Sequence, residues 1–328
     1  MTPALSFLIG LATIASVYAL LALALDVQFG HTGLLNFGHV AFFGVGAFAS
    51  AIVTLPPPGS PAYVDAGASY QVGFGLPVFL GVGAAMVAGG LLALAVGALS
   101  VRLASHYLAV ATFALAEIVH ATLANEIWLT RGHFGITTVP QPGKGTLVPV
   151  ELYPLVTLLA VIAIGLVAWG LLGRLTDAPF GRALRAVRDD ELAARTFGRS
   201  GFGLKLRAFV LGGVVAGLAG SLFTHALGVV HVEQFVPLVT FQVWLAVLMG
   251  GAGRHRGVVI GAFVFIAIRE GTRFMGDIPG LEAVARSNPS FIPSLRYVLI
   301  GAMLILVVRY FPGGMLPERT RRAPEVDA

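Results

Sequence analysis

The stretch that decides the fold is residues 5–25, which read LSFLIGLATIASVYALLALAL. A helix needs about 20 mostly apolar residues to cross the hydrocarbon core of a bilayer, so this uncharged run predicts a membrane-spanning helix. No lysine or arginine precedes it, and the first basic residue of the chain is Arg102. Because a secretory signal begins with a basic region, we expect a retained helix. The Ala22-Leu23-Ala24 triplet leaves signal cleavage as the alternative.

The composition of the whole chain indicates the same environment. Of its 328 residues, 57% are hydrophobic and 11% are charged, whereas soluble domains average about 25% charged residues. The mean hydropathy is +0.87. These values exclude an ordinary soluble enzyme, and they exclude disorder, which requires low hydrophobicity. The absence of cysteine excludes a disulfide framework, thiolate catalysis and a cysteine-ligated metal site.

Further apolar runs follow the first one along the chain. Two of them, at about 236–250 and 257–272, are short for full spans, so we expect them to be tilted, broken or re-entrant. The nine runs together predict an all-α, polytopic, integral membrane helical bundle. The other six runs lie at about 34–55, 76–99, 107–127, 152–173, 209–230 and 294–311.

The placement of the charges predicts the orientation. Segment 174–207 carries eight basic and four acidic residues. Four more arginines lie near the C-terminus, at Arg309, Arg319, Arg321 and Arg322. Short loops rich in lysine and arginine stay in the cytoplasm. This rule places segment 174–207 and the C-terminus in the cytoplasm and the N-terminus outside, and an odd number of spans agrees with it.

Segment 174–207 also predicts a short helix of its own. Asp177 is the expected N-cap, the helix is expected over Gly181–Phe197, and Gly198 is the expected stop. From these residues alone, the segment is either a solvated loop that sets the orientation or a docking helix for a cytoplasmic partner. Side chains four residues apart predict two ion pairs, Arg185 with Asp189 and Glu191 with Arg195.

The chain has no nucleotide-binding motif of the form G-x-x-x-x-G-K-[ST]. The nearest fragment, Gly143-Lys144-Gly145-Thr146, lacks the first glycine and has glycine where serine or threonine is required. If ATP drives transport here, the motor must be another chain.

The sequence of the charged segment resembles the cytoplasmic loop of ABC importer permeases, in particular the LivM-type permeases of branched-chain amino acid transporters. The resemblance begins with the stretch 181–198, GRALRAVRDDELAARTFG. Three other stretches are similar to that family in the same order, namely GHVAFFGVGAF at 38–48, VAGLAGSL at 215–222 and FPGGML at 311–316. The turn GGAGRHRG at 250–257 departs from the family pattern, because it lacks a Gly-Pro step.

The resemblance implies one permease domain over 1–316, with a coupling loop at 174–207 and a short cytoplasmic tail at 317–328. It implies alternating access in the cytoplasmic (inner) membrane of a bacterium or archaeon. The implied partners are a second homologous permease subunit, two cytoplasmic ATP-binding subunits, an external substrate-binding protein and membrane lipid. No cofactor is expected in this chain, since ATP is bound by the partners, and no nucleic acid is expected. The residues implied in coupling are Arg185, Asp189, Glu191, Ala193, Ala194 and Gly198.

The substrate class stays open at this point. Branched-chain or related small amino acids are the expected substrates, and the sister permeases for urea and short-chain amides share nearly all of these features. A proton-coupled secondary transporter or a channel is the alternative from another class.

Ionisable groups inside apolar runs are candidates for function. His39, beside Gly38, either bonds to a neighbouring helix or faces the substrate where glycine interrupts the helix. In the second reading the translocation path is lined by Asn36, His39, Phe42, Phe43 and Gly44.

Glu117 and His120 lie three residues apart on one helix face. They are expected either to pair within the bundle or to form a proton relay. No other Asp, Glu and His cluster has catalytic or metal-ligand spacing, so we expect neither a metal site nor an enzyme. The basic turn Arg254-His255-Arg256 is expected at the membrane interface, where a partner is the alternative contact.

Overall fold

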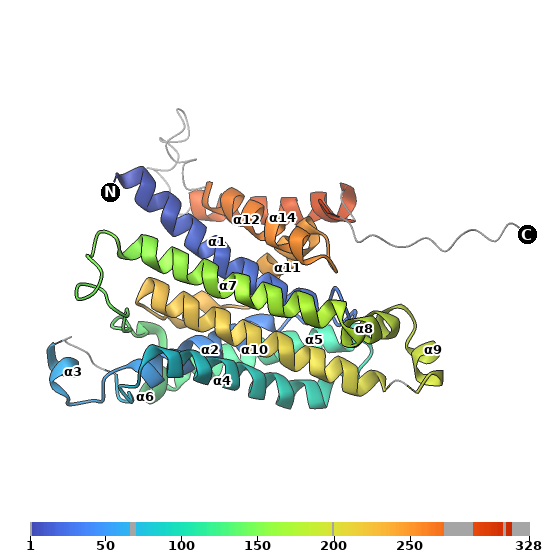
Figure 1. Ribbon diagram of the computed structural model, residues 1–328, viewed down its shortest axis with the longest axis horizontal. Helices are drawn as coiled ribbons and strands as arrows, with labels where there is room; N and C mark the ends of the chain where they lie inside the picture. Colours follow the sequence, from blue (N-terminus) through green and yellow to red (C-terminus); the bar gives the residue numbers. More distant parts are fainter. Residues whose placement is uncertain (1, 66–69, 199, 272–290, 311–312, 317–328) are drawn as a thin grey trace, which may run out of the picture.

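The computed structural model describes residues 2–65, 70–198, 200–271, 291–310 and 313–316, and in these residues it contains helices and no strand (Figure 1). Each of the nine apolar runs contains a helix within its described residues. The long helices are α1 Pro3–Gln28, α2 His39–Thr54, α4 Val78–Ser100, α5 Ser105–Asn125, α7 Tyr153–Asp177, α10 Gly201–Leu227, α11 Leu238–Gly250, α12 His255–Gly271 and α14 Phe291–Tyr310. The short elements are α3 Pro61–Asp65, α6 Ile127–Thr130, α8 Pro179–Asp189, α9 Glu191–Thr196 and the 3-10 turns Gly132–Phe134 and Val232–Phe235.

Five helices of the described chain are long and apolar enough to cross a bilayer, namely α1, α4, α5, α7 and α10. Helix α11 has 13 residues and is about 20 Å long, against roughly 30 Å for the hydrocarbon core. Helix α2 is also short, because it begins at His39, whereas the apolar run begins at residue 34. The expectation of shortened elements is therefore confirmed for α11 and extends to α2.

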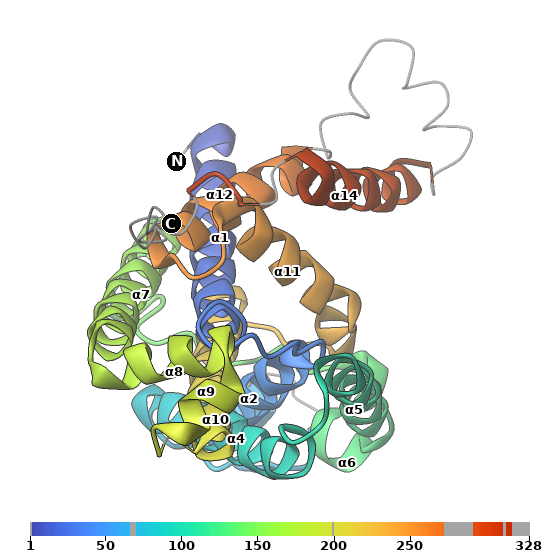
Figure 2. The same ribbon diagram turned by 90° about the vertical axis from the view of Figure 1, so that its right-hand side faces the viewer.

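Helix α10 packs against α2, α4 and α1, and α2 and α4 also pack against each other (Figure 2). Its glycines allow this close approach, because a Cβ atom at Gly217 would overlap the carbonyl oxygen of Ala85 on α4. A Cβ atom at Gly220 would overlap the carbonyl oxygen of Phe43 on α2. Small residues at such spacing let helix backbones pack tightly in a membrane.

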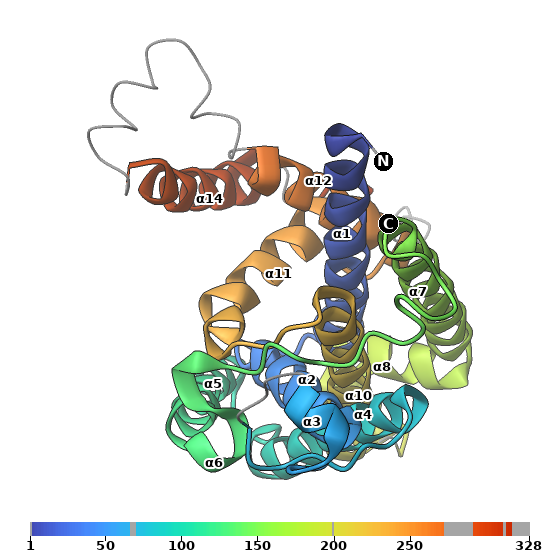
Figure 3. The same cartoon turned by 90° about the vertical axis from the view of Figure 1, so that its left-hand side faces the viewer.

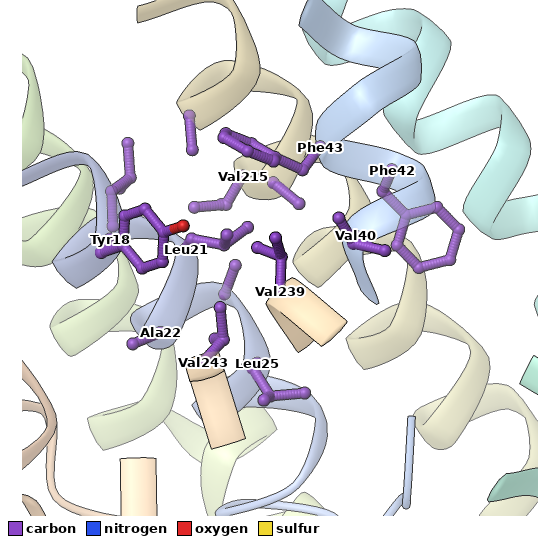
Figure 4. Close-up of a cluster of buried hydrophobic side chains, with 14 of the residues drawn as sticks. Tyr18, Leu21, Ala22, Leu25, Val40, Phe42, Phe43, Val215, Val239 and Val243 are labelled. Carbon is purple, nitrogen blue, oxygen red and sulfur yellow. The ribbon is translucent and has the colours of Figure 1, made fainter. Parts of the chain in front are cut away.

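Helices α1, α2 and α11 enclose an apolar core (Figure 4). Leu21 and Leu25 of α1 lie there with Val40 of α2 and with Val239 and Val243 of α11, and all five are buried. Because α1 is buried over most of its length, it is an integral part of the bundle.

The two ends of the bundle carry different short elements. Helices α8 and α9 lie at one end and α3 and α6 at the other (Figures 1 and 3). Helix α1 begins at the end opposite α8 and α9. Segment 313–316 packs on the last turn of α11, where Met315 N donates to Met249 O at 2.7 Å, and this turn adjoins the start of α12. The tail at 317–328 lies outside the described residues.

Candidate functional site

Helices α8 and α9 are two separate helices, so the prediction of one helix over Gly181–Phe197 is wrong. Asp190 separates them in an extended conformation, with φ −153° and ψ 105°. Its side chain accepts a hydrogen bond of 2.9 Å from Ala193 N, and this bond caps α9. An aspartate that caps a new helix competes with continuation of the previous one. Asp177 is not the N-cap of α8, because it belongs to the end of α7 and Ala178 holds the cap position.

Helix α8 is fixed to the end of the bundle by one apolar face and by two arginines. The side chains of Leu184 and Val187 form the apolar face of α8 and are buried. Arg185 Nη1 donates to the carbonyl oxygen of Thr176, at the end of α7, over 3.1 Å. The predicted pair of Arg185 with Asp189 is therefore wrong, and Asp189 instead contacts Arg188 Nε at 3.0 Å.

Arg188 makes the longest-range contact of α8. Its Nη1 donates a hydrogen bond to the carbonyl oxygen of Gly30. Gly30 lies in segment 29–38, the irregular stretch that joins α1 to α2. The contact therefore connects the exposed helix directly to the chain that enters α2.

Helix α9 is held by Glu191. The predicted pair with Arg195 is confirmed at 2.8 Å, and Lys205 Nζ on α10 contacts the second carboxylate oxygen at 2.6 Å. The hydrogen bond from Lys205 is the main cause of a lowered pKa for Glu191, and Arg195 adds to it. Of the two alanines of α9, Ala194 is buried and Ala193 is exposed. Gly198 ends the helix at a positive φ of 72°, which confirms its role as the stop.

A buried carboxylate, Asp26, lies at the end of α1 beside α8. It accepts from Gly253 N at 2.7 Å, and its second oxygen lies 2.9 Å from His255 Nδ1. His255 Nε2 in turn lies 3.1 Å from Thr176 Oγ1, and His31 Nδ1 lies 3.9 Å from the Asp26 carboxylate. Asp26 and His31 are functional-site residues that were not predicted from the sequence, although a single carboxylate at the end of an apolar run is a recognisable signal.

The three side chains Asp26, His31 and His255 are also of the types that bind a metal. One ligand atom from each lies within 4.8 Å of the others. These atoms are engaged in hydrogen bonds within the protein, and the positive charge of Arg185 is close enough to act on His31. We therefore interpret the cluster as a polar tie between α1, α7 and α12.

Segment 29–38 is held in place by hydrogen bonds of Asn36, both within the segment and to the neighbouring helices. Asn36 Nδ2 donates to Gln28 Oε1 at 2.8 Å, and Asn36 Oδ1 accepts from Gly38 N at 2.8 Å. Trp244 of α11 donates to the Asn36 carbonyl oxygen at 3.0 Å. His39 is fully buried, with Nε2 3.1 Å from the Leu21 carbonyl oxygen and with no hydrogen-bond partner for Nδ1 among the described residues.

The remaining residues predicted for the path lie in the apolar core. Phe42 packs edge-on against Phe209, and Phe43 packs against Phe223 and Phe235. Figure 4 shows Phe42 and Phe43 leaving α2 in different directions. Within the described part of the chain, the four cavities of about 350, 450, 460 and 520 Å³ are lined by none of the five path residues Asn36, His39, Phe42, Phe43 and Gly44.

Glu117 and His120 line the same cavity of about 350 Å³, between α5 and the start of α11. No hydrogen bond or ion pair joins them within the described residues. In the part of the chain that the structure describes, His120 Nε2 is buried without a hydrogen-bond partner, whereas Glu117 is exposed. The structure thus brings the two side chains to one cavity and leaves them apart.

Comparison with known proteins shows that this chain is similar to transport system permease components. Residues 7–308 match the family described as branched-chain amino acid transport system / permease component. The match covers most of the chain, and the protein belongs to this family.

Named relatives extend over nearly the whole chain. The high-affinity branched-chain amino acid transport system permease protein LivM of Salmonella typhimurium is 29% identical, over 94% of this chain and 70% of the relative. The Escherichia coli protein of that name is also 29% identical, with the same coverage. The probable LivM of Methanocaldococcus jannaschii is 27% identical, over 92% of this chain and 91% of the relative. No solved structure matches the chain.

Proposed function

We propose that this protein is the transmembrane permease subunit of an ATP-driven ABC importer, and that it moves branched-chain or related small amino acids by alternating access. The relatives named for branched-chain amino acid transport support the substrate class. The chain has no nucleotide-binding motif, and we propose that ATP hydrolysis occurs on partner subunits. The full assembly contains two such subunits, a second homologous permease and an external substrate-binding protein.

The observation that carries this proposal is the exposed apolar surface of α9. Leu192 is 75% exposed and Phe197 is 85% exposed, with the small side chain of Ala193 between them in sequence. Large apolar side chains left exposed among the charges at this end of the bundle are candidates for contact with a protein partner. The neighbouring charges of Arg195 and Asp189 would set the register of an ATP-binding subunit against this surface.

Motion of the docked partner would reach the membrane part through α8. Arg188 contacts Gly30, and segment 29–38 continues through Asn36 to His39 at the start of α2. We assign the closed state of the path to the present packing of Phe42 and Phe43. Displacement of segment 29–38 would rotate α2 and expose the path residues, together with the backbone dipoles at the interrupted helix.

The same proposal sets the position in the membrane. The end that carries α8 and α9 lies in the cytoplasm, in agreement with its excess of arginine, and the chain begins outside. Nine spans are proposed for the inner membrane of a bacterium or archaeon. Five of them meet the length and hydropathy of a full span, and the shorter helices cross where neighbouring helices satisfy their ends.

One observation favours a second candidate, a proton-coupled secondary transporter. His120 has a buried, unpartnered ring nitrogen beside a cavity that Glu117 also lines. Such a pair could carry a proton if water joined the two groups. In that case, uptake would collapse with the proton gradient even at constant ATP.

The test is uptake by proteoliposomes that contain the complete complex, with ATP enclosed at the α8–α9 side. Radiolabelled leucine should enter only with ATP and the binding protein, and a proton uncoupler should leave the rate unchanged. Labelled urea and acetamide are the parallel substrates. Uptake of those compounds without leucine would replace the substrate class, and loss of uptake with the uncoupler would replace the mechanism.

A further inference from the structure

An apolar groove runs along the outside of the bundle between α1, α7 and α12. It has a volume of about 460 Å³. Leu20 and Leu23 of α1 form its buried floor, whereas Leu166 of α7 and Ile260 of α12 are exposed at its rim. Gly165 of α7 leaves it open, since a Cβ atom there would have no neighbour within 4 Å. The groove therefore faces the lipid side of the bundle and can admit an extended hydrocarbon chain.

A basic cavity of about 520 Å³ continues from this groove at the end of the bundle that carries α8 and α9. Its lining includes one carboxylate, Asp177, and the two histidines His31 and His255. A cavity with this excess of positive charge is complementary to an anion, and arginine binds phosphate through paired N–H donors. The arginines that line it are Arg174, Arg185, Arg254 and Arg256.

The groove and the basic cavity share two residues, Trp169 and Arg256. Tryptophan is enriched where the hydrocarbon core meets the polar interface, so Trp169 marks that level. Along α7 the groove extends from Trp169 back to Val161, about 12 Å of helix. This length fits within the roughly 15 Å of hydrocarbon that one leaflet contributes.

We propose that these two cavities form one binding site for an anionic phospholipid. An acyl chain lies in the groove between α1, α7 and α12, and the phosphate lies among the arginines. Because Arg185 of α8 and the α11–α12 turn both line the headgroup cavity, the bound lipid joins the exposed helix to the membrane helices. Basic cavities between membrane helices are a known way of holding acidic headgroups.

Trp169 supplies the reporter for the test. The full-length protein is placed in bilayers of zwitterionic lipid with increasing fractions of phosphatidylglycerol whose acyl chains are brominated. The quenching of Trp169 fluorescence is the difference between the parent protein and Trp169→Phe. Brominated phosphatidylcholine is the lipid control, and excess inorganic phosphate tests for a headgroup-only site.

The variants separate the arginines of the site from general surface charge. Arg174→Gln combined with Arg256→Gln removes two charges from the headgroup cavity. Arg207→Gln is the matched control, since Arg207 is exposed on α10 and outside both cavities. Half-maximal quenching should need about tenfold less phosphatidylglycerol than phosphatidylcholine. The double variant should lose this preference, and Arg207→Gln and added phosphate should leave it intact.

Three results would overturn the proposal. Equal quenching by the two lipids would show that the headgroup is not recognised. A preference that survives in the double variant would place the recognition elsewhere. A Trp169 signal that responds to neither lipid would show that no acyl chain enters the groove.

Discussion

Arg188 donates a hydrogen bond from Nη1 to the carbonyl oxygen of Gly30, and so joins α8, at the end of the bundle, to the chain that leads into α2. The two residues are 158 positions apart in sequence. Arg185 makes a second attachment, to the end of α7. Helix α8 is thus fixed to two different parts of the bundle, and its movement must displace at least one of them.

The first prediction concerns this contact. Arg188→Ala should reduce ATP-driven uptake about tenfold, because a hydrogen bond from a charged donor contributes roughly 1.5–3 kcal/mol. Arg182→Ala is the control, since Arg182 is exposed on the same helix and contacts only the Asp177 carbonyl oxygen at 3.2 Å among the bonds described. Initial rates of leucine uptake at equal amounts of inserted protein measure the effect. Equal rates in the two variants would remove Arg188 from the transmission path.

The ion pairs of Glu191 should make the thermal stability of the protein depend on pH. The pKa of Glu191 is lowered below its ordinary value of 4.5, mainly by Lys205. A lowered folded-state pKa adds stability above the unfolded value, and this stability is lost as the pH falls through the folded value. Parent protein should therefore unfold at a higher temperature than Glu191→Gln at pH 7. The difference should shrink below pH 4.5, and a constant difference down to pH 3 would contradict the role of the charge.

The third prediction concerns the buried carboxylate of Asp26. Asp26→Ala removes the acceptor for Gly253 N and the partner of His255, and should cost about 3 kcal/mol. Asp26→Asn keeps one oxygen as an acceptor and should cost nearer to 1 kcal/mol. Thermal unfolding in mild detergent ranks the two variants. Equal stabilities would mean that the tie between α1 and α12 depends on other contacts.

The fourth prediction concerns the packing of α10. Gly217→Ala should destabilise the bundle by roughly 1–3 kcal/mol, because the added methyl overlaps the Ala85 carbonyl oxygen. Gly165→Ala is the matched control, with open space at its Cβ position. The same unfolding assay compares them. If Gly217→Ala were as stable as Gly165→Ala, α4 and α10 would not be in the close contact described.

The long helices could be predicted from sequence because their apolar runs are long and uninterrupted. Each of the nine runs forms a helix, and the errors lie at the ends. The apolar run predicts a helix from residue 34, whereas α2 begins at His39. Apolar content alone does not show that the Asn36 side chain hydrogen-bonds to Gln28 and to Gly38 N. The break at Asp190 was missed for a similar reason. Its local capping bond outweighs the helical spacing of the charges around it.

The contacts of the candidate site were less predictable. Pairs close in sequence follow from helical geometry, as Glu191 and Arg195 do. Asp26 and His255 are 229 positions apart, and Arg188 and Gly30 are 158 apart. Such pairs depend on how the helices assemble, and a single sequence carries no periodic signal for them. Arg185 shows the limit within one helix, because Thr176 at the end of α7 competes with Asp189 for its guanidinium.

The number of leucine molecules transported per ATP hydrolysed by the complete complex in proteoliposomes measures directly whether α8 and α9 couple the two processes. Glu191→Lys breaks the attachment of α9 to α10, and Gly198→Asp opposes the positive φ that ends α9. We predict that both variants insert normally and that the ratio falls by about tenfold, within the usual range of coupling energies. An unchanged ratio in both variants would contradict the assignment of α8 and α9 as the coupling element.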